Sequence, residues 1–237
     1  MNNSKPIAVV TGASTGIGEQ ISLKLSSSGY HVILISRSEK KLLKVQEKIE
    51  NTGNHCQVLP VDISKLDLLS CIKEQIKHPN KVEVLVNNAG IGFFNKFEDV
   101  TIENWEQQIN TNLRGSFLMS QFFVPYMKDN RSGKILFVNS VAGLSPYPFA
   151  SAYVASKYGL TGLSASLREE LREYNIKVIS VHPGAVDTPL WDKSESDFPR
   201  EEMLLAKDVS NTIVQAILSP NNLVCEEIII RRTAGDF

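Results

Sequence analysis

Seven short apolar runs alternate with helix-period segments along almost the whole chain. Several runs are nearly continuous in Val, Ile and Leu, which is typical of parallel strands covered on both faces. The predicted strands are Ile7–Val10, His31–Ile35, Gln57–Val61, Val82–Val86, Lys134–Val138, Lys177–Val181 and Glu227–Ile230. The predicted helices are Glu19–Ser27, Glu39–Ile49, one opened by a capping box at Ser64–Asp67, Glu103–Lys128 with a break point near Gly115, Ser151–Tyr174 and Asp208–Leu218.

Strand–helix repetition with right-handed crossovers predicts an α/β fold. We expect a single-domain, Rossmann-type, doubly wound and mostly parallel seven-stranded sheet with helices on both faces. The 237 residues, 42% of them hydrophobic, supply a core for one such domain. No linker or repeat marks a second one, so we expect residues 1–237 to form one domain. The least regular stretch, 192–200, is either a substrate lid or a solvated loop.

Charge and cysteine usage exclude several classes of protein. The net charge of −1 supplies no field that favours nucleic acid or an anionic membrane. Cys56, Cys71 and Cys225 are scattered and form no CxxC pair, so neither a disulfide framework nor a metal site is expected. The chain shows no signal-peptide pattern and no apolar run of membrane-spanning length. These features predict a cytoplasmic protein.

Three glycines follow the first predicted strand and open the next helix: Gly12, Gly16 and Gly18. Glycine lets the backbone turn tightly and approach a phosphate without a Cβ in the way. The helix start then presents free N–H groups and its positive dipole end to a pyrophosphate. The pattern indicates a dinucleotide site, with a plain strand–helix turn as the alternative.

The end of the second strand carries Ser36, Arg37 and Ser38. A site for unphosphorylated ribose usually places Asp or Glu there. Without that carboxylate, and with the Arg37 guanidinium available to pair with a 2′-phosphate, the sequence favours NADP(H). The alternative is a solvated arginine beside a helix-capping Ser38.

Two further strand ends contribute to the predicted cofactor site. Asp62 ends the third strand, and we expect it to meet the adenine edge because Ser64 is better placed to cap the next helix. The segment Asn87–Gly90 ends the fourth strand, where small residues let the backbone approach the adenosine ribose. Ligands of open α/β sheets bind outside such carboxyl ends.

Tyr153 and Lys157 are four residues apart on a predicted helix, so both side chains lie on one face. A nearby ammonium favours the phenolate, so we expect Lys157 to lower the pKa of Tyr153. Ser140 ends the fifth strand, where its hydroxyl can donate to a carbonyl oxygen. No Gly-x-Ser-x-Gly elbow surrounds it, which disfavours a nucleophilic serine. His182 precedes Pro183 and is expected to be structural.

With these motifs the chain resembles the classical short-chain dehydrogenases/reductases over nearly its whole length. The matching segments are the glycine motif at Thr11–Gly18, Asn-Asn-Ala-Gly at Asn87–Gly90, the catalytic asparagine at Asn112, the serine at Ser140, Tyr-x-x-x-Lys at Tyr153 and Lys157, and Pro-Gly-x-x-x-Thr at Pro183, Gly184 and Thr188. The resemblance implies cofactor contacts from Gly12, Ser14, Thr15, Gly16, Ile17, Gly18, Arg37, Ser38, Asp62, Ile63, Asn88, Ala89, Gly90, Tyr153, Lys157, Pro183, Gly184, Val186 and Thr188.

The resemblance also implies a role for each catalytic residue. Tyr153 would act as acid or base, Ser140 would orient the carbonyl, and Lys157 would bind the nicotinamide ribose and tune Tyr153. Asn112 would hold a water that links Lys157 to solvent, and Thr188 would meet the carboxamide. Family members are commonly homodimers or homotetramers through two long helices. The C-terminus lacks the family's common glycine-rich ending, which leaves tetramer contacts there open.

Together these features predict an NADP(H)-dependent oxidoreductase that acts on a small carbonyl or secondary alcohol, as a carbonyl or 3-oxoacyl-type reductase does. The alternative is a nucleotide-sensing regulatory protein on the same fold, against which the intact Ser, Tyr, Lys and Asn set argues. Side chains that either line the substrate or belong to the core are Phe93, Phe94, Leu144, Pro146, Phe149, Leu190 and Trp191.

Overall fold

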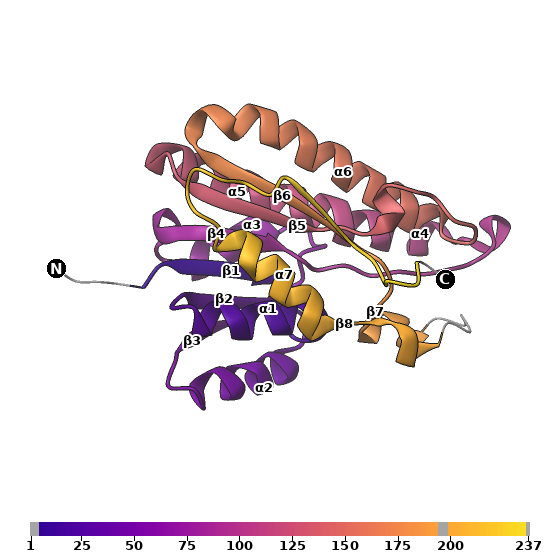
Figure 1. Cartoon of the computed structure of the whole chain (residues 1–237), viewed down its shortest axis with the longest axis horizontal. Coiled ribbons are helices and arrows are strands. Elements are labelled where there is room, and N and C mark those ends of the chain that lie inside the picture. Colours follow the sequence, from indigo (N-terminus) through magenta and orange to yellow (C-terminus); the bar gives the residue numbers. More distant parts are fainter. Residues whose placement is uncertain (1–4, 194–198, 236–237) are drawn as a thin grey trace.

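A seven-stranded parallel sheet forms the centre of the molecule in the computed structural model, which describes residues 5–193 and 199–235 (Figure 1). The strand order is β3-β2-β1-β4-β5-β6-β9. The strands are β1 (Ile7–Thr11), β2 (His31–Ser36), β3 (Cys56–Pro60), β4 (Val82–Asn87), β5 (Gly133–Val138), β6 (Ile176–Pro183) and β9 (Glu227–Ile230). The predicted doubly wound fold and all seven predicted strands are confirmed, with small shifts of their bounds.

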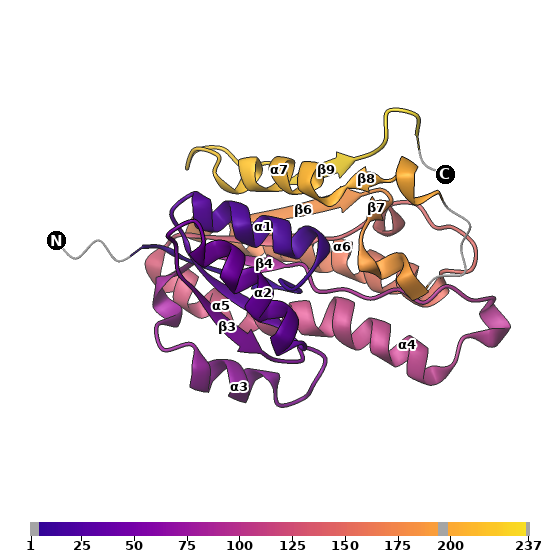
Figure 2. The same ribbon diagram turned by 90° about the horizontal axis from the view of Figure 1, so that it is seen from below.

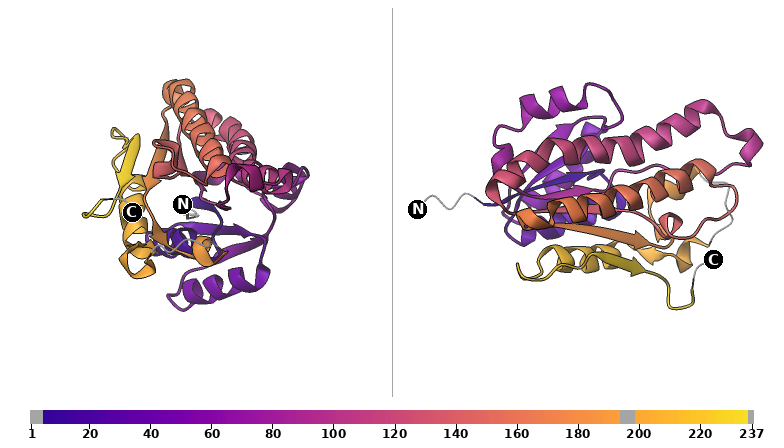
Figure 3. Two further views of the ribbon diagram at one scale, coloured as in Figure 1. Left: turned by 90° about the vertical axis from the view of Figure 1, so that its right-hand side faces the viewer. Right: turned by 90° about the horizontal axis from the view of Figure 1, so that it is seen from above.

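Helices cover both faces of the sheet (Figures 1 and 3). One face carries α1 (Gly16–Ser27), α2 (Glu39–Glu50) and α7 (Ala206–Ile217), and the other carries α3 (Leu68–Gln75), α5 (Gly115–Asn130) and α6 (Ser151–Leu171). Successive strand residues therefore enter different cores. Val10 packs on the α1 side and Val9 on the α3 side, and both are fully buried. This two-sided burial explains why the strands are apolar throughout.

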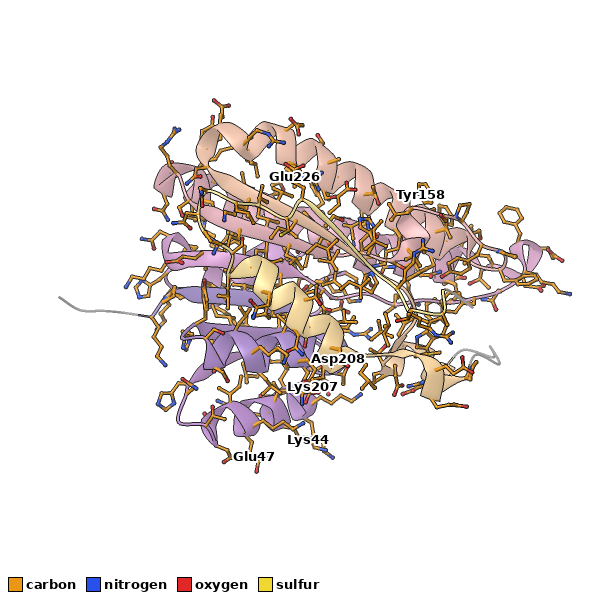
Figure 4. All side chains as sticks on the ribbon, viewed as in Figure 1. Lys44, Glu47, Tyr158, Lys207, Asp208 and Glu226 are labelled. Atoms are coloured by element: carbon orange, nitrogen blue, oxygen red, sulfur yellow. The ribbon has the colours of Figure 1, made fainter. Side chains whose placement is uncertain are left out.

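The surface helices are apolar on one face only, in contrast to the strands, which are apolar on both. In α2, Leu42, Val45 and Ile49 face the core at helical spacing. Lys44 and Glu47 project away from the sheet into solvent (Figure 4). This amphipathic spacing specifies both the helix and the face it buries.

The predicted helix Glu103–Lys128 is divided into three parts. It consists of α4 (Ile102–Gln108), a π-helical turn η3 (Ile109–Arg114) and α5, so the break falls just before Gly115. A Cβ at Gly115 would lie 2.8 Å from the Ile63 side chain, which shows how closely α5 approaches the end of β3. π-Helical turns are rare and are often found at functional sites. This one carries Asn112.

The predicted capping box at Ser64–Asp67 is wrong. The helix α3 begins at Leu68, and Asp67 at its N-cap makes no side-chain capping bond. Ser64 instead donates its backbone N–H and its hydroxyl to Asp62 Oδ1, at 2.9 and 2.7 Å. The local Asx turn wins because both Ser64 donors reach one carboxylate oxygen two residues back.

Shorter elements complete the described chain. The 3₁₀ helices are η1 (Pro79–Lys81), η2 (Phe97–Asp99), η4 (Val141–Gly143), η5 (Arg172–Tyr174), η6 (Pro189–Lys193) and η7 (Arg200–Glu202). A two-stranded pair that sequence reasoning missed, β7 (Val186–Asp187) with β8 (Leu204–Leu205), lies beyond the end of β6 (Figure 2). Of the predicted lid 192–200, residues 194–198 lie outside the described residues.

Two findings concern broad function classes. Among the described residues, every helix is too short or too polar to cross a membrane. Residues 5–193 and 199–235 also contain no group of three or more His, Cys, Asp or Glu side chains arranged to hold a metal ion.

Candidate active site

The predicted site residues gather at the carboxyl edge of the sheet. The chain leaves β1 towards β2 on one side, whereas β4, β5 and β6 follow on the other, so the strand order reverses between β1 and β4. Crevices at such reversal points are where open α/β sheets bind ligands. The glycine turn after β1 lies directly at this point.

The glycine turn has the conformation that a phosphate cradle requires. Gly12 and Gly16 have φ values of 64° and 59°, in the left-handed region that favours glycine. A Cβ at Gly18 would lie 2.3 Å from Gly12 O and 2.3 Å from Asn88 Nδ2. Thr15, the N-cap of α1, makes no side-chain capping bond, so the helix start keeps donors for an anion. The turn therefore fits a dinucleotide pyrophosphate.

Asn88 supports this turn from the neighbouring strand. Its Nδ2 donates to Thr11 O at 2.9 Å and to Gly12 O at 3.2 Å. Thr11 Oγ1 accepts from the backbone N–H groups of Asn88 and Ala89, at 3.0 and 3.1 Å. The Asn88 side chain thus holds the two strand ends together. Thr11 also links the two strand ends, through its Oγ1, and sequence reasoning did not single out this role.

The adenosine end of the predicted site lies over β2 and β3. Arg37 is exposed and forms no ion pair within residues 5–193 and 199–235. Ser38 is the N-cap of α2 but makes no side-chain capping bond. Asp62 accepts both Ser64 bonds on Oδ1, which leaves Oδ2 for an external donor. Ile63 is buried.

The remaining residues of the glycine turn are neither fully buried nor fully exposed. Ser14 and Thr15 are half-buried in the turn, and Ile17 packs against the α1-side core. At the end of β4, a Cβ at Gly90 would lie 3.5 Å from Asn112 Oδ1 and 3.8 Å from Lys157 Nζ. Gly90 therefore joins the predicted cofactor half to the predicted catalytic half.

Ser140 lies two residues beyond β5 in an extended conformation, with φ −166° and ψ 159°. Its Oγ accepts a hydrogen bond from the N–H of Ala142 at 3.1 Å. This bond uses a lone pair of Oγ and not its hydrogen, so the hydroxyl proton remains for donation to an acceptor. Ser140 is nine-tenths buried, so such a donation takes place largely away from water.

Tyr153, in the first turn of α6, is 7% exposed and packs with Ala142 and Ala150. Burial raises the pKa of its phenol above the ordinary value, and a hydrogen bond with Ser140 opposes the shift. The pKa of Tyr153 in the cofactor-free protein is therefore shifted in the direction opposite to the one expected from the Lys157 ammonium, because the phenol is buried. At neutral pH Tyr153 is a protonated donor.

Lys157 is 4% exposed, one turn further along α6. Its Nζ donates to Val138 O at 3.1 Å, and no carboxylate of the described chain pairs with it. Burial without a counter-charge lowers the pKa of Lys157 to about 8. An ammonium carries three protons, so two donors remain for hydroxyl groups of a ligand.

Asn112 is held in place by three side-chain hydrogen bonds. Its Oδ1 accepts from Ile91 N at 2.8 Å, and its Nδ2 donates to Ile91 O and Ser156 Oγ at 2.9 Å each. The amide clamps the loop after β4 to helix α6. Both N–H groups of the amide are used, and Oδ1 keeps one lone pair that a water could still reach.

The carboxyl end of β6 supplies the predicted nicotinamide side. Gly184 donates to Ile230 O at 2.8 Å, Pro183 ends β6, and Val186 is buried in β7. A Cβ at Gly16 would lie 2.9 Å from Thr188 Cγ2, so this segment approaches the glycine turn. Arg200 donates to Thr188 O at 3.1 Å and to Asp187 Oδ1 through Nε at 2.7 Å.

Aromatic side chains surround Tyr153. Phe94 meets the Tyr153 ring edge-on with centroids 5.6 Å apart, and it stacks on Trp191 at 5.5 Å. Phe149 is 60% exposed and has a φ of 64°, which is strained for a residue with an aromatic side chain. Gln108 was missed by sequence reasoning: its Oε1 accepts from Phe93 N at 3.0 Å and fixes this loop.

Comparison with known proteins identifies the family. The family model described as short chain dehydrogenase matches residues 6–198. The chain belongs to the short-chain dehydrogenase family. It is 34% identical to a sepiapterin reductase of Chlorobaculum tepidum over 240 residues, which cover 98% of each chain. It is 36% identical to a 3-oxoacyl-(acyl-carrier-protein) reductase of Staphylococcus aureus, over 87% of this chain and 88% of that one.

Solved structures of short-chain dehydrogenases agree with this assignment. A metagenomic short-chain oxidoreductase in complex with NADP superimposes with a TM-score of 0.84 at 31% identity, and covers 96% of this chain and 97% of its own. As a member of this family, the chain is an oxidoreductase that acts on CH–OH or C=O groups.

Proposed function

We propose that this short-chain dehydrogenase is an NADP(H)-dependent carbonyl reductase in which Tyr153 protonates the substrate oxygen. The observation that carries the proposal is the arrangement of Ser140, Tyr153 and Lys157 beside the glycine turn, at one carboxyl edge of the sheet. Each group is buried and each carries a proton donor: Ser140 and Tyr153 as hydroxyls that bond to each other, and Lys157 as an ammonium. The chemistry supplied by a bound nicotinamide dinucleotide is hydride transfer to the carbonyl carbon.

The protein's own residues then divide the remaining work. Ser140 donates its hydroxyl proton to the carbonyl oxygen and holds that oxygen beside the phenol. Tyr153 transfers its proton to the oxygen as negative charge develops there. The raised pKa of Tyr153 in the cofactor-free protein suits this role because the phenol stays protonated at neutral pH. Lys157 uses its two spare donors to orient the nicotinamide ribose.

The preference for NADP(H) is supported by charge at the end of β2. Arg37 is exposed and lacks an ion pair within the described chain, and no carboxylate stands at this strand end. An exposed guanidinium there matches a 2′-phosphate in charge and in its planar donors. The NADP complexes among the solved relatives agree with this choice.

The substrate class follows from the surroundings of Tyr153. Phe94 and Trp191 lie on that side. This favours an uncharged or partly apolar aldehyde or ketone. The similarity to sepiapterin and 3-oxoacyl reductases is consistent with such a carbonyl. We further propose a homodimer or homotetramer, as the family resemblance implies. From the sequence itself we propose a cytoplasmic location and a lid in 192–200.

A carbonyl panel tests the proposal. Purified protein should oxidise NADPH with at least one aldehyde or ketone from a set of aryl, alkyl, dicarbonyl and oxoacyl thioester compounds. Tyr153→Phe is the matched control, because it keeps the ring and removes the proton donor. NADPH binding without turnover of any carbonyl would instead favour a nucleotide sensor.

A further inference from the structure

A buried histidine contacts the backbone of Ser140, and the reaction described above does not use it. His182, at the carboxyl end of β6, has no solvent exposure. Its Nδ1 lies 3.1 Å from Ser140 O, and its Nε2 lies 3.0 Å from Ser180 Oγ. Both ring nitrogens therefore have a partner inside the protein.

The partners determine where the proton of the His182 ring lies. Ser140 O is a carbonyl and can only accept, so Nδ1 must carry a hydrogen. In the neutral ring Nε2 is then an acceptor, and the Ser180 hydroxyl donates to it. This is a single, fully satisfied hydrogen-bond arrangement. It keeps the ring in one tautomer and one orientation.

His182 gives the Ser140 carbonyl a hydrogen bond from the neighbouring strand β6, which the backbone pairing of the sheet does not reach. The β5–β6 pairing ends at Val138 with Val181, and the last backbone bond is Asn139 N to Val181 O at 2.8 Å. Ser140 lies one residue further on. Its carbonyl accepts from Gly143 N at 2.9 Å, but that bond belongs to the same local turn. The bond from His182 fastens the turn to the neighbouring strand.

We propose that His182 is a positioning residue for carbonyl reduction, which fixes the main chain of Ser140 so that the hydroxyl stays aimed at the substrate oxygen beside Tyr153. The inference rests on the proposed function, because it gives Ser140 its task. A displacement of about 1 Å at a reacting group can lower a rate by as much as 100-fold. A fully buried ring bonded at both nitrogens restricts such a displacement.

The electrostatic surroundings keep the ring neutral. Burial lowers the pKa of His182, Lys157 and Arg168 lower it further, and Glu227 and the Ser140 carbonyl oppose the shift. The histidine therefore stays in its single-donor, single-acceptor form at physiological pH. A charged ring would carry a hydrogen on Nε2 and could no longer accept from the Ser180 hydroxyl.

Two amide substitutions separate the two ring contacts. In His182→Asn the amide nitrogen stands as many bonds from Cβ as Nδ1 does, so it can still donate to Ser140 O. In His182→Gln the amide nitrogen matches Nε2 and loses that contact. We expect His182→Gln to lower kcat by about 10- to 100-fold with the NADPH dissociation constant within about twofold of wild type. His182→Asn should recover most of kcat.

Controls make the outcome specific. His31→Gln, at the start of β2 and the opposite end of the sheet, should leave kcat unchanged. Ser140→Ala sets the loss expected when the hydroxyl itself is absent, and a Ser140→Ala enzyme as active as wild type would refute the proposed function rather than the role of His182. If Ser140→Ala is impaired while His182→Gln matches wild type or His182→Asn, His182 has no positioning role.

Nitrogen NMR of the unmodified protein tests the same inference without a variant. The ¹⁵N shifts of His182 should show a protonated Nδ1 and an unprotonated Nε2, with and without bound NADPH. A protonated Nε2 in the neutral ring would overturn the assignment, because Nδ1 would then have no hydrogen to give Ser140 O.

Discussion

The Nζ atom of Lys157 lies 5.6 Å from the centre of the Tyr153 ring, on the same face of α6. Neither side chain has a charged partner within the described chain, and both are buried. The Tyr153 hydroxyl and the Lys157 ammonium are therefore both largely removed from water. For Lys157, burial of the ammonium without a counter-charge costs the folded protein stability near neutral pH.

Lys157→Met should stabilise the cofactor-free protein near pH 7 while it abolishes turnover. Folding lowers the Lys157 pKa from 10.5 to about 8, which costs about 3 kcal/mol where both states are charged. Methionine keeps the apolar stem but leaves Val138 O without this donor, so we expect a net gain of about 1–2 kcal/mol. Urea unfolding at pH 7 measures it.

The pH dependence of that gain has a definite sign. Below pH 8 both folded and unfolded chains carry the Lys157 proton, so the full cost applies. As pH rises through 8 the folded chain releases its proton first, wild-type stability increases, and the gap between the proteins narrows. A gap that stays constant or widens from pH 7 to pH 9 would contradict the assigned pKa.

Tyr153 should titrate above its ordinary value in the cofactor-free protein. Burial raises the pKa of its phenol, so the phenolate absorbance of wild type minus Tyr153→Phe should show no ionisation below about pH 9. The difference spectrum removes the other five tyrosines. An ionisation midpoint near neutrality would instead show that Lys157 outweighs burial, as the sequence alone suggested.

Sequence reasoning located the strands because a strand that is buried on both faces needs consecutive apolar residues, such as Val9 and Val10. It could not locate the π-helical turn, since the Asn112 bonds to Ile91 that accompany it are tertiary. It predicted Ser64 and not Asp62 as a helix cap. Serine and aspartate are both common cap residues, so residue type alone could not show which hydrogen bonds form. The contact of His182 with Ser140 depends on the β5–β6 register, which no local pattern encodes.

Gly18→Ala should greatly weaken NADPH binding. The added Cβ would lie 2.3 Å from Gly12 O, which is backbone and cannot move without opening the turn. We expect about a 5- to 150-fold increase in dissociation constant, which corresponds to strain on the order of 1–3 kcal/mol. Fluorescence titration with NADPH measures it. Gly162→Ala, where nothing lies within 4 Å of the new Cβ, is the matched control and should bind as wild type does.

Arg37→Asp should shift cofactor preference from NADPH towards NADH. Arg37 is exposed at the end of β2 and has no ion pair within the described chain, so its guanidinium is available to a 2′-phosphate. Aspartate would repel that phosphate and accept from a free ribose hydroxyl. The lost contact and the added repulsion together should change the ratio of kcat/KM values about 100-fold.

A second variant with the same change in charge tests whether Arg37 contacts the 2′-phosphate directly or only contributes to the overall electrostatic field. Lys44→Asp also alters the charge by two units, but Lys44 projects from the outer face of α2 away from the sheet (Figure 4). Because Lys44 lies on α2 and not at the end of β2, it cannot take the place of Arg37, so this variant should keep the wild-type ratio. If wild type prefers NADH, or if the two variants change the ratio equally, Arg37 does not read the 2′-phosphate.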